Sequence, residues 1–281
     1  MAHFICLALA SARRTLSAVD ICPTDADILM SHILGKDRCY LLAHGGDTVL
    51  TAVQTKRFNA QIEERCRGVP VAYLVGKRDF WDFTLQVNQH TLVPRPETEH
   101  LVESALDVGD AQTSLRVLDM GTGSGAIALA LATERPHWQI VATDINRDTL
   151  SVARRNAARL HLEHVEFVQS DWFVAIAGRY DLIVSNPPYI AEDDQHMDVL
   201  RYEPRRALVS GSDGLQAIRQ IIQQATAYLA PQGWLLFEHG ADQGAACRAL
   251  LAQHGLTDIV TKQDLAGLDR LSGGRWDREM Q

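Results

Sequence analysis

The second half of the chain alternates short apolar runs with segments of helical character. Runs at 117–118, 139–143, 165–170 and 180–185 are short, rich in aliphatic residues, and end in polar residues, as buried strands do. Glycines follow the first run and lead into an apolar, helix-like stretch at 126–132. Strands that alternate with helices predict an α/β fold built on a parallel sheet.

The first part of the chain has a helical pattern instead. Apolar residues at helical spacing occupy 26–34 and 53–66, and these segments end at Gly35 and Gly68, where glycine commonly stops a helix. We therefore predict a small helical bundle.

The residues after this bundle alternate apolar and polar side chains, as in 83–88, which predicts a β-hairpin. A length of 281 residues with 46% apolar composition suffices for one large and one small unit. We expect a helical domain at 1–75, a hairpin linker at 76–95 and a sheet domain at 96–281.

Charge is unevenly distributed and bears on the partners. The net charge is −8, yet residues 1–80 hold ten basic and eight acidic side chains, so the excess of acid lies in the sheet domain. An acidic domain is a poor nonspecific binder of nucleic acid, and we expect no direct nucleic-acid partner. The cluster Arg201, Arg205 and Arg206 is interpreted as solvated surface.

The cysteines and the apolar segments indicate in which cellular compartment the protein works. The five cysteines are odd in number and form no C-x-x-C pair, which favours reduced thiols in a cytoplasmic protein. No metal-ligand spacing is present, so no metal is expected. The apolar run 4–10 lacks a basic flank and is far too short to span a membrane, and we expect no membrane association.

The glycine stretch predicts a ligand site. Its sequence is Asp119-Met120-Gly121-Thr122-Gly123-Ser124-Gly125, between a predicted strand and a predicted helix. Glycines let a ligand approach the backbone, and the N–H groups of a helix N-terminus attract an anionic group such as a carboxylate. The spacing G-x-G-x-G differs from the G-x-G-x-x-G of dinucleotide sites, which disfavours nicotinamide cofactors.

Two further strand ends carry polar groups. Asp144 follows the second strand at the distance where an acid reaches ribose hydroxyls in nucleoside sites. Asp171 and Trp172 follow the third strand and offer an acceptor and a ring to a base. Such acids are often only caps or turn residues, but four polar strand ends in succession point to one ligand-binding edge.

The fourth strand ends in Asn186-Pro187-Pro188-Tyr189. The prolines fix φ and lack an N–H, which holds nearby carbonyls outward. Asn186 can donate and accept together, and the ring of Tyr189 can cover a flat group. The tetrapeptide therefore suits a planar target such as a carboxamide or a base edge, although a simple proline turn is an alternative.

Taken together, these motifs resemble the S-adenosylmethionine-dependent methyltransferases that modify planar amide or amino nitrogens. More narrowly, the chain is similar to the release-factor glutamine N5-methyltransferases, the HemK or PrmC family, over nearly its whole length. The residues that carry this narrower resemblance are 68–76, 79–81, 92–99, 170–173, 184–190, 202–204, 207–208 and 236–240.

This resemblance implies a Rossmann-like class I methyltransferase sheet, with a helical N-terminal domain that contacts the substrate. It implies S-adenosyl-L-methionine as donor, with Gly121 to Gly125 at its methionine part, Asp144 at its ribose, and Trp172 with Asp171 at its adenine. The implied substrate is the glutamine of a Gly-Gly-Gln motif in class 1 peptide chain release factors. Asn186, Pro187, Pro188 and Tyr189 would bind it, and Asn186 would also border the donor.

The chemistry requires acceptors more than a base. An amide nitrogen gains positive charge as a methyl group arrives, and oxygens facing its N–H bonds stabilise that charge. The carbonyl of Pro187 and the side-chain oxygen of Asn186 are the expected acceptors, so we assign catalysis to Asn186, Pro187 and Tyr189. His239 is interpreted as structural.

Three alternatives remain open from the sequence. A glutamine methyltransferase acting on a ribosomal protein would share the Asn-Pro-Pro-Tyr motif. Amino-methyltransferases of DNA or RNA bases have similar loops, but the acidic balance disfavours them. A noncatalytic donor-binding protein is the third, although it would have little need of both Asn186 and Tyr189.

Overall fold

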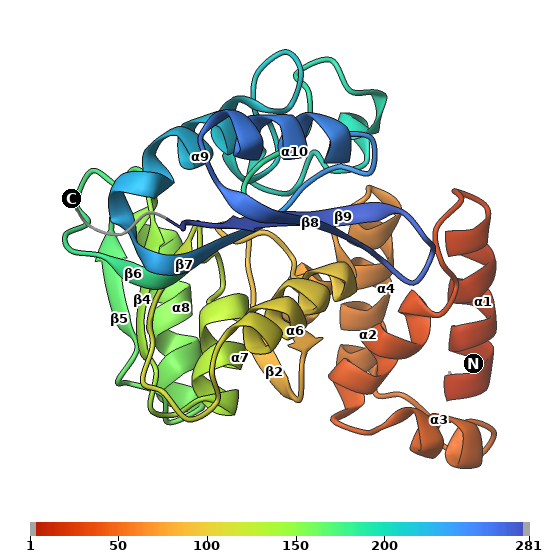
Figure 1. Cartoon of the computed structure of the whole chain (residues 1–281). Coiled ribbons are helices and arrows are strands. Elements are labelled where there is room, and N and C mark those ends of the chain that lie inside the picture. The colour runs from red at the N-terminus through yellow and green to blue at the C-terminus, as the bar shows by residue number, and fades with distance from the viewer. Residues whose placement is uncertain (1–3, 278–281) are drawn as a thin grey trace. The chain divides into compact units, whose positions relative to one another are not determined.

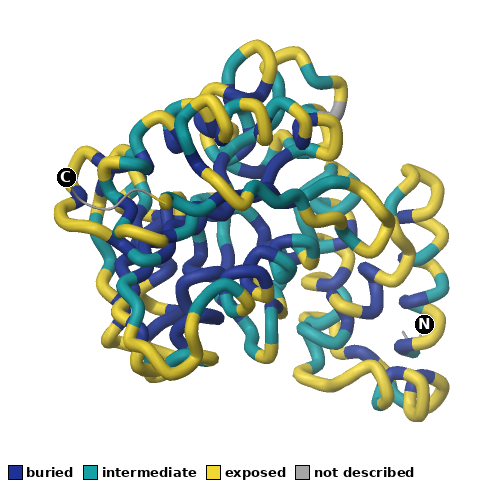
Figure 2. The backbone as a smooth tube through the Cα atoms, in the orientation of Figure 1, coloured by how far each residue is buried: buried dark blue, intermediate teal, exposed yellow. Residues whose placement is uncertain are grey.

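The structure is a computed structural model and describes residues 4–277. The chain forms two compact units, Met1–Lys77 and Arg78–Gln281, whose boundary falls within the first strand of a hairpin. Each unit has its own buried core (Figure 2).

The first unit is helical, as the apolar spacing predicts. Its helices are α1 (Ile5–Ser17), α2 (Asp25–Leu34), α3 (Arg38–His44), α4 (Ala52–Cys66) and α5 (Val71–Val75). Leucine, isoleucine and phenylalanine side chains from α1, α2 and α4 form its core. Gly35 ends α2 with φ 64°, a conformation that glycine adopts without strain, and Thr51 and Gln54 form a capping box at α4.

The predicted hairpin is present as β1 (Lys77–Phe80) and β2 (Phe83–Gln86). It is shorter than the alternating pattern suggests, because residues 87–95 leave the hairpin as irregular chain. That segment contributes to the pocket described below.

The second unit contains a seven-stranded sheet in the order β5-β4-β3-β6-β7-β9-β8. Strands β3 to β7 run parallel, and β9 pairs antiparallel with both β7 and β8. The strands are β3 (Arg116–Met120), β4 (Gln139–Asp144), β5 (Glu166–Gln169), β6 (Tyr180–Ser185), β7 (Leu229–Glu238), β8 (Thr257–Gln263) and β9 (Asp269–Arg275). The four predicted strands are thus confirmed with small differences at their ends.

Helices cover both faces of this sheet (Figure 1). Side chains on the strands alternate between two apolar clusters, as successive residues of a strand must: Val117 and Leu182 join one, and Leu118 and Ile183 the other. The helices of the second unit are α6 (Glu99–Val108), α7 (Ala126–Glu134) and α8 (Arg147–Arg159) on one face, and α9 (Gln216–Tyr228) and α10 (Gly244–Gln253) on the other. Short 3-10 turns lie at Pro96–Thr98, Gln195–Asp198 and Arg205–Ala207.

Helix α7 is buried along almost its whole length, with Ala126 to Ala132 all in the core. It is therefore apolar on every side, which is the pattern of a helix surrounded by protein. Because α7 follows the glycine loop directly, its packing fixes that loop against the sheet.

We predict that Leu129→Ala in α7 destabilises the protein by about 2–5 kcal/mol, since it removes a fully buried side chain and leaves a cavity. Thermal or urea unfolding measures this change. Val174→Ala is the matched control, because the Val174 side chain is 83% exposed and its loss should change stability by less than about 0.5 kcal/mol. Equal stability of the two variants would contradict the assignment of α7 to the core.

Candidate functional site

The loops after β3 and β6 start from paired positions in the sheet. Met120 lies opposite Ser185 in the parallel register, and the Ser185 hydroxyl donates a hydrogen bond of 2.8 Å to the Met120 carbonyl. Strand β3 is the switch point of the sheet, because the chain continues to β4 on one side and reaches β6 later on the other. Ligands of open α/β sheets bind at such points.

The glycine loop has the backbone that its composition predicts. Gly121, Gly123 and Gly125 have φ of 72°, 59° and 89°, in the left-handed region that residues with a Cβ avoid. The N–H of Gly123 donates to Asp144 Oδ2 at 3.2 Å, and the N–H of Thr122 donates to the Thr143 carbonyl at 2.8 Å. These bonds tie the loop to the end of β4.

Asp119 supports the loop from inside the protein. It is fully buried, and its Oδ2 accepts the Thr122 hydroxyl at 2.6 Å and the Ala128 N–H at 3.2 Å. Burial raises the pKa of Asp119 to about 7, against the lowering effect of those two hydrogen bonds. This acid therefore braces the loop and the start of α7, and it does not line the pocket.

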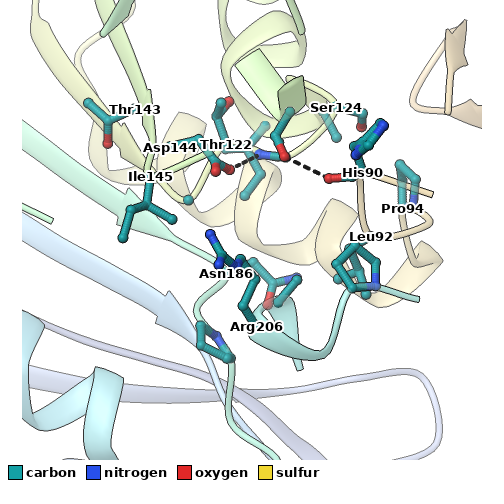
Figure 3. A pocket seen from close by; sticks show the side chains of 18 of the residues that line it. His90, Leu92, Pro94, Thr122, Ser124, Thr143, Asp144, Ile145, Asn186 and Arg206 are labelled. Carbon is teal, nitrogen blue, oxygen red and sulfur yellow. Dashed lines mark hydrogen bonds between the residues drawn. The ribbon is translucent and has the colours of Figure 1, made fainter. Parts of the chain in front are cut away.

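A pocket of about 370 Å³ opens where these elements meet (Figure 3). Asp144 and Ile145 stand on one side and His90, Leu92 and Pro94 on the other, with Asn186 and Arg206 between them. Of the residues assigned from the sequence, those lining the pocket are Gly121, Thr122, Gly123, Ser124, Asp144, Asp171, Trp172, Asn186 and Pro188.

Three assigned residues do not line this pocket. Gly125 forms the N-cap of α7, Pro187 is buried, and the hydroxyl of Tyr189 donates to Glu238 Oε1 at 2.9 Å. Burial and the neighbouring Glu238 carboxylate both raise the pKa of Tyr189, so this phenol stays protonated. Its roles in substrate binding and catalysis remain predictions.

Trp172 has a strained backbone. Its φ is 47°, which is rare for a bulky residue and costs of order 1–3 kcal/mol. The Ser170 hydroxyl holds this turn by donating to the Trp172 carbonyl at 2.7 Å and accepting the Ala175 N–H at 3.0 Å. The side chain of Trp172 lines the pocket, so the strain lies where a ligand site is expected.

The wall formed by residues 90–95 was missing from the sequence-based site. Glu203 holds it in place by accepting the Val93 N–H at 3.0 Å and pairing with Arg95. The sequence contained a signal for this wall, because both segments belong to the motifs of the family resemblance. The alternating apolar and polar pattern alone predicts that residues 90–95 belong to the hairpin.

Arg206 belongs to the arginine cluster that the sequence analysis interprets as solvated surface. All three arginines, Arg201, Arg205 and Arg206, are exposed, as that interpretation expects. Arg206 nevertheless lines the pocket, and its charge tends to lower the pKa of Asp144, which burial raises. An exposed residue at a pocket mouth has no distinct sequence pattern.

His239 is structural, as predicted. It is fully buried, its Nδ1 lies 2.8 Å from the Gly240 carbonyl, and its Nε2 lies 2.8 Å from the Ser272 hydroxyl. The five cysteines are all free thiols.

Within residues 4–277 no helix is both long and apolar enough to cross a membrane. The same part of the chain contains no group of three or more side chains suited to a metal ion.

The pocket fits a nucleoside linked to an amino acid. Its volume lies within the range of small-molecule sites, its glycine loop leads into the N-terminus of α7, which favours an anionic group, and the Asp144 carboxylate accepts hydrogen bonds as a diol requires. Trp172 offers a ring to a base. These are the features by which S-adenosylmethionine would be held.

The chain is similar to known proteins along most of its length. Residues 98–264 match the methyltransferase small domain, and residues 8–76 match the PrmC N-terminal domain. A release factor glutamine methyltransferase of Xylella fastidiosa strain 9a5c is 52% identical over 254 residues, which cover 89% of this chain and 92% of that protein. One from Yersinia pestis is 46% identical over 272 residues, covering 96% and 97%.

A solved structure shares the fold at lower identity. The ribosomal protein L11 methylase of Lactobacillus delbrueckii subsp. bulgaricus has a TM-score of 0.51 and 20% identity, covering 68% of this chain and 85% of that one. The fold and the pocket together thus define an S-adenosylmethionine-dependent methyltransferase of class I. Within that class, the chain belongs to the release factor glutamine methyltransferase family.

We predict that Asp119 makes the protein less stable as pH rises from about 4 to about 7. The folded state keeps the proton of Asp119 up to its raised pKa of about 7, whereas an unfolded aspartate loses it near pH 4. The folded state therefore binds more protons in this window, and stability falls with rising pH. Between pH 5 and pH 8 this amounts to about 2–3 kcal/mol.

The variant Asp119→Asn keeps an acceptor for Thr122 and Ala128 but cannot ionise. Its unfolding free energy should therefore fall less than that of the wild type over the same pH range, as measured by urea unfolding at each pH. Parallel curves for the two proteins would show that Asp119 does not titrate in this way.

Proposed function

We propose that this protein transfers a methyl group from S-adenosylmethionine to the side-chain nitrogen of the glutamine in the Gly-Gly-Gln motif of class 1 peptide chain release factors. The observation that carries the proposal is the adjacency of the glycine loop and Asn186, on paired strands and around one pocket. The relatives named above support the choice of release factors.

The donor side of the pocket is assigned from its chemistry. Gly121, Thr122, Gly123 and Ser124 present backbone groups to the methionine part, with Gly125 completing the turn. Asp144 accepts the ribose hydroxyls, while Trp172 and Asp171 border the adenine. S-adenosylmethionine supplies an electrophilic methyl group on a sulfonium.

The acceptor side is formed by Asn186, Pro187, Pro188 and Tyr189. The Asn186 side-chain oxygen and the Pro187 carbonyl accept the two N–H bonds of the glutamine amide, and so stabilise the positive charge that grows on its nitrogen. Pro188 and the ring of Tyr189 limit the position of the amide plane. Good alignment of nitrogen and methyl carbon contributes up to about 7–11 kcal/mol to such reactions.

The helical residues 1–75 are proposed to recognise the release factor and residues 96–281 to hold both reacting groups. The segment 76–95, which contains the hairpin β1–β2, is proposed to link the two. Residues 8–76 match the PrmC N-terminal domain, which supports a dedicated N-terminal module. A role in translation places the protein in the cytoplasm, where its free cysteines stay reduced.

A ribosomal protein and nucleic-acid bases are the two alternative substrates to the release factor. A ribosomal protein could present a glutamine to the same loop, but the similarity to the L11 methylase is at the level of the fold. DNA or RNA bases would need a basic surface, whereas the net charge is −8.

We predict that Asp144→Ala weakens S-adenosylmethionine binding about 10- to 100-fold, because it removes a charged acceptor, worth roughly 1.5–3 kcal/mol, from the ribose. Isothermal calorimetry gives the affinity. Asp110→Ala is the matched control, since Asp110 is an exposed acid before the opposite end of β3 and should leave binding unchanged. Unaltered affinity in Asp144→Ala would remove Asp144 from the donor site.

The substrate is tested with tritiated S-adenosylmethionine and a purified class 1 release factor. We expect label on the factor carrying Gly-Gly-Gln and none on its Gly-Gly-Ala variant, a ribosomal protein fraction, DNA or rRNA. Asn186→Ala should reduce the rate at least tenfold, because the substrate amide loses a buried partner worth about 1–3 kcal/mol as well as its alignment. Label on the Gly-Gly-Ala factor, or a wild-type rate for Asn186→Ala, would refute the proposal.

A further inference from the structure

A buried acid lies behind the proposed acceptor loop. Glu238 ends β7, the strand next to β6 in the sheet, and it is only 2% exposed. It does not line the pocket, so it makes no direct contact with a ligand there. Burying a carboxylate is costly unless it is well paired, and its partners therefore indicate what it does.

Glu238 accepts hydrogen bonds from two hydroxyls. Thr98 Oγ1 lies 2.7 Å from Oε2, and the Tyr189 hydroxyl lies 2.9 Å from Oε1. An ionised carboxylate can only accept, so both hydroxyls donate their single proton to it. Burial raises the pKa of Glu238, while these two bonds and the charge of Arg270 oppose that rise.

The direction of the Thr98 bond determines the next one. The hydroxyl hydrogen of Thr98 is engaged in the hydrogen bond to Glu238, so its oxygen can only accept a further bond. It accepts one from the side-chain amide Nδ2 of Asn186 at 3.0 Å. The amide nitrogen of Asn186 is thereby held towards Thr98. Its oxygen Oδ1 is left as the acceptor on the other side of the group, and Asn186 lines the pocket.

We propose that Glu238 and Thr98 are positioning residues that fix the orientation of the Asn186 side chain, so that its oxygen and not its nitrogen meets the substrate amide. This inference rests on the proposed function, because only a substrate NH₂ group needs that oxygen. If Thr98 had no carboxylate beside it, its hydroxyl could donate to Asn186 Oδ1. The flipped Asn186 amide would then turn its NH₂ group towards the substrate NH₂ group, and two donors cannot form a hydrogen bond.

The relay also strengthens the acceptor. Hydrogen bonds in a chain polarise one another, so an amide that donates through Nδ2 towards a carboxylate becomes a better acceptor at Oδ1. The positive charge that grows on the substrate nitrogen is then stabilised more in the transition state than before it. The same carboxylate binds Tyr189, so both ends of the Asn186–Tyr189 loop are tied to one group.

Variants at Thr98 test the relay. Thr98→Val has nearly the same shape but no hydroxyl, and we expect kcat on the release factor to fall at least tenfold while S-adenosylmethionine affinity by calorimetry stays within twofold. Thr98→Ser restores the hydroxyl and should recover kcat to within about threefold of wild type. A structural role for the side chain would not separate serine from valine in this way.

Glu238→Leu provides a second test. Leucine has a similar size but no acceptor, so the Thr98 hydroxyl is free to donate to Asn186 Oδ1, which reverses the relay, and kcat should fall as in Thr98→Val. Thr133→Val is the matched control, because the Thr133 hydroxyl donates only to the Leu129 carbonyl within α7, and its kcat should be that of wild type. Thermal unfolding identifies any variant that fails to fold.

The outcomes separate this inference from the function on which it rests. A wild-type protein that does not label the release factor refutes the proposed function. An active wild type whose Thr98→Val variant keeps its kcat refutes the relay alone. Equal losses in Thr98→Ser and Thr98→Val would also refute it, since the hydroxyl would then not be what matters.

Discussion

The parallel pairing of β3 with β6 is the constraint on which the rest of the site depends. It places Met120 opposite Ser185, so the two loops that follow must leave the sheet together. The Ser185 hydroxyl bonded to the Met120 carbonyl fixes this pairing at its last residue. A shift of register by one residue would turn the side chains of β6 to the opposite face, and would separate Asn186 from the glycine loop.

Three acids at or near the carboxyl ends of β3, β4 and β7 share a role that their charge alone does not suggest. Asp119, Asp144 and Glu238 accept hydrogen bonds from groups in or beside the loops that form the site. Burial raises the pKa of each. Burying these three carboxyl groups is unfavourable, but the hydrogen bonds that they accept fix the geometry of the loops. Such use of buried polar groups is expected near functional sites.

The sequence predicts most of the sheet and half of the pocket. Strand ends are local features, so Gly121, Asp144, Trp172 and Asn186 could be placed from apolar runs and glycine spacing. Periodicity could not place the wall at 90–95 or the Thr98–Glu238 contact, because both depend on side chains that join residues far apart in sequence. The position of β9 between β7 and β8 is equally nonlocal, and Gly273 of β9 packs closely on Leu235 and Leu236.

Because β9 is the last strand in the chain, the donor side of the site is synthesised well before the strand that supports the acceptor side is fully paired. The strands that carry the donor loops, β3, β4 and β5, are complete by residue 169, whereas the far side of β7 is unpaired until residues 269–275 join it. Leu271 pairs with Glu238 itself. A chain truncated before β9 would therefore retain the loops of the donor site but lose the strand that pairs with β7, behind Asn186. We expect such a fragment to bind S-adenosylmethionine without catalysing methyl transfer.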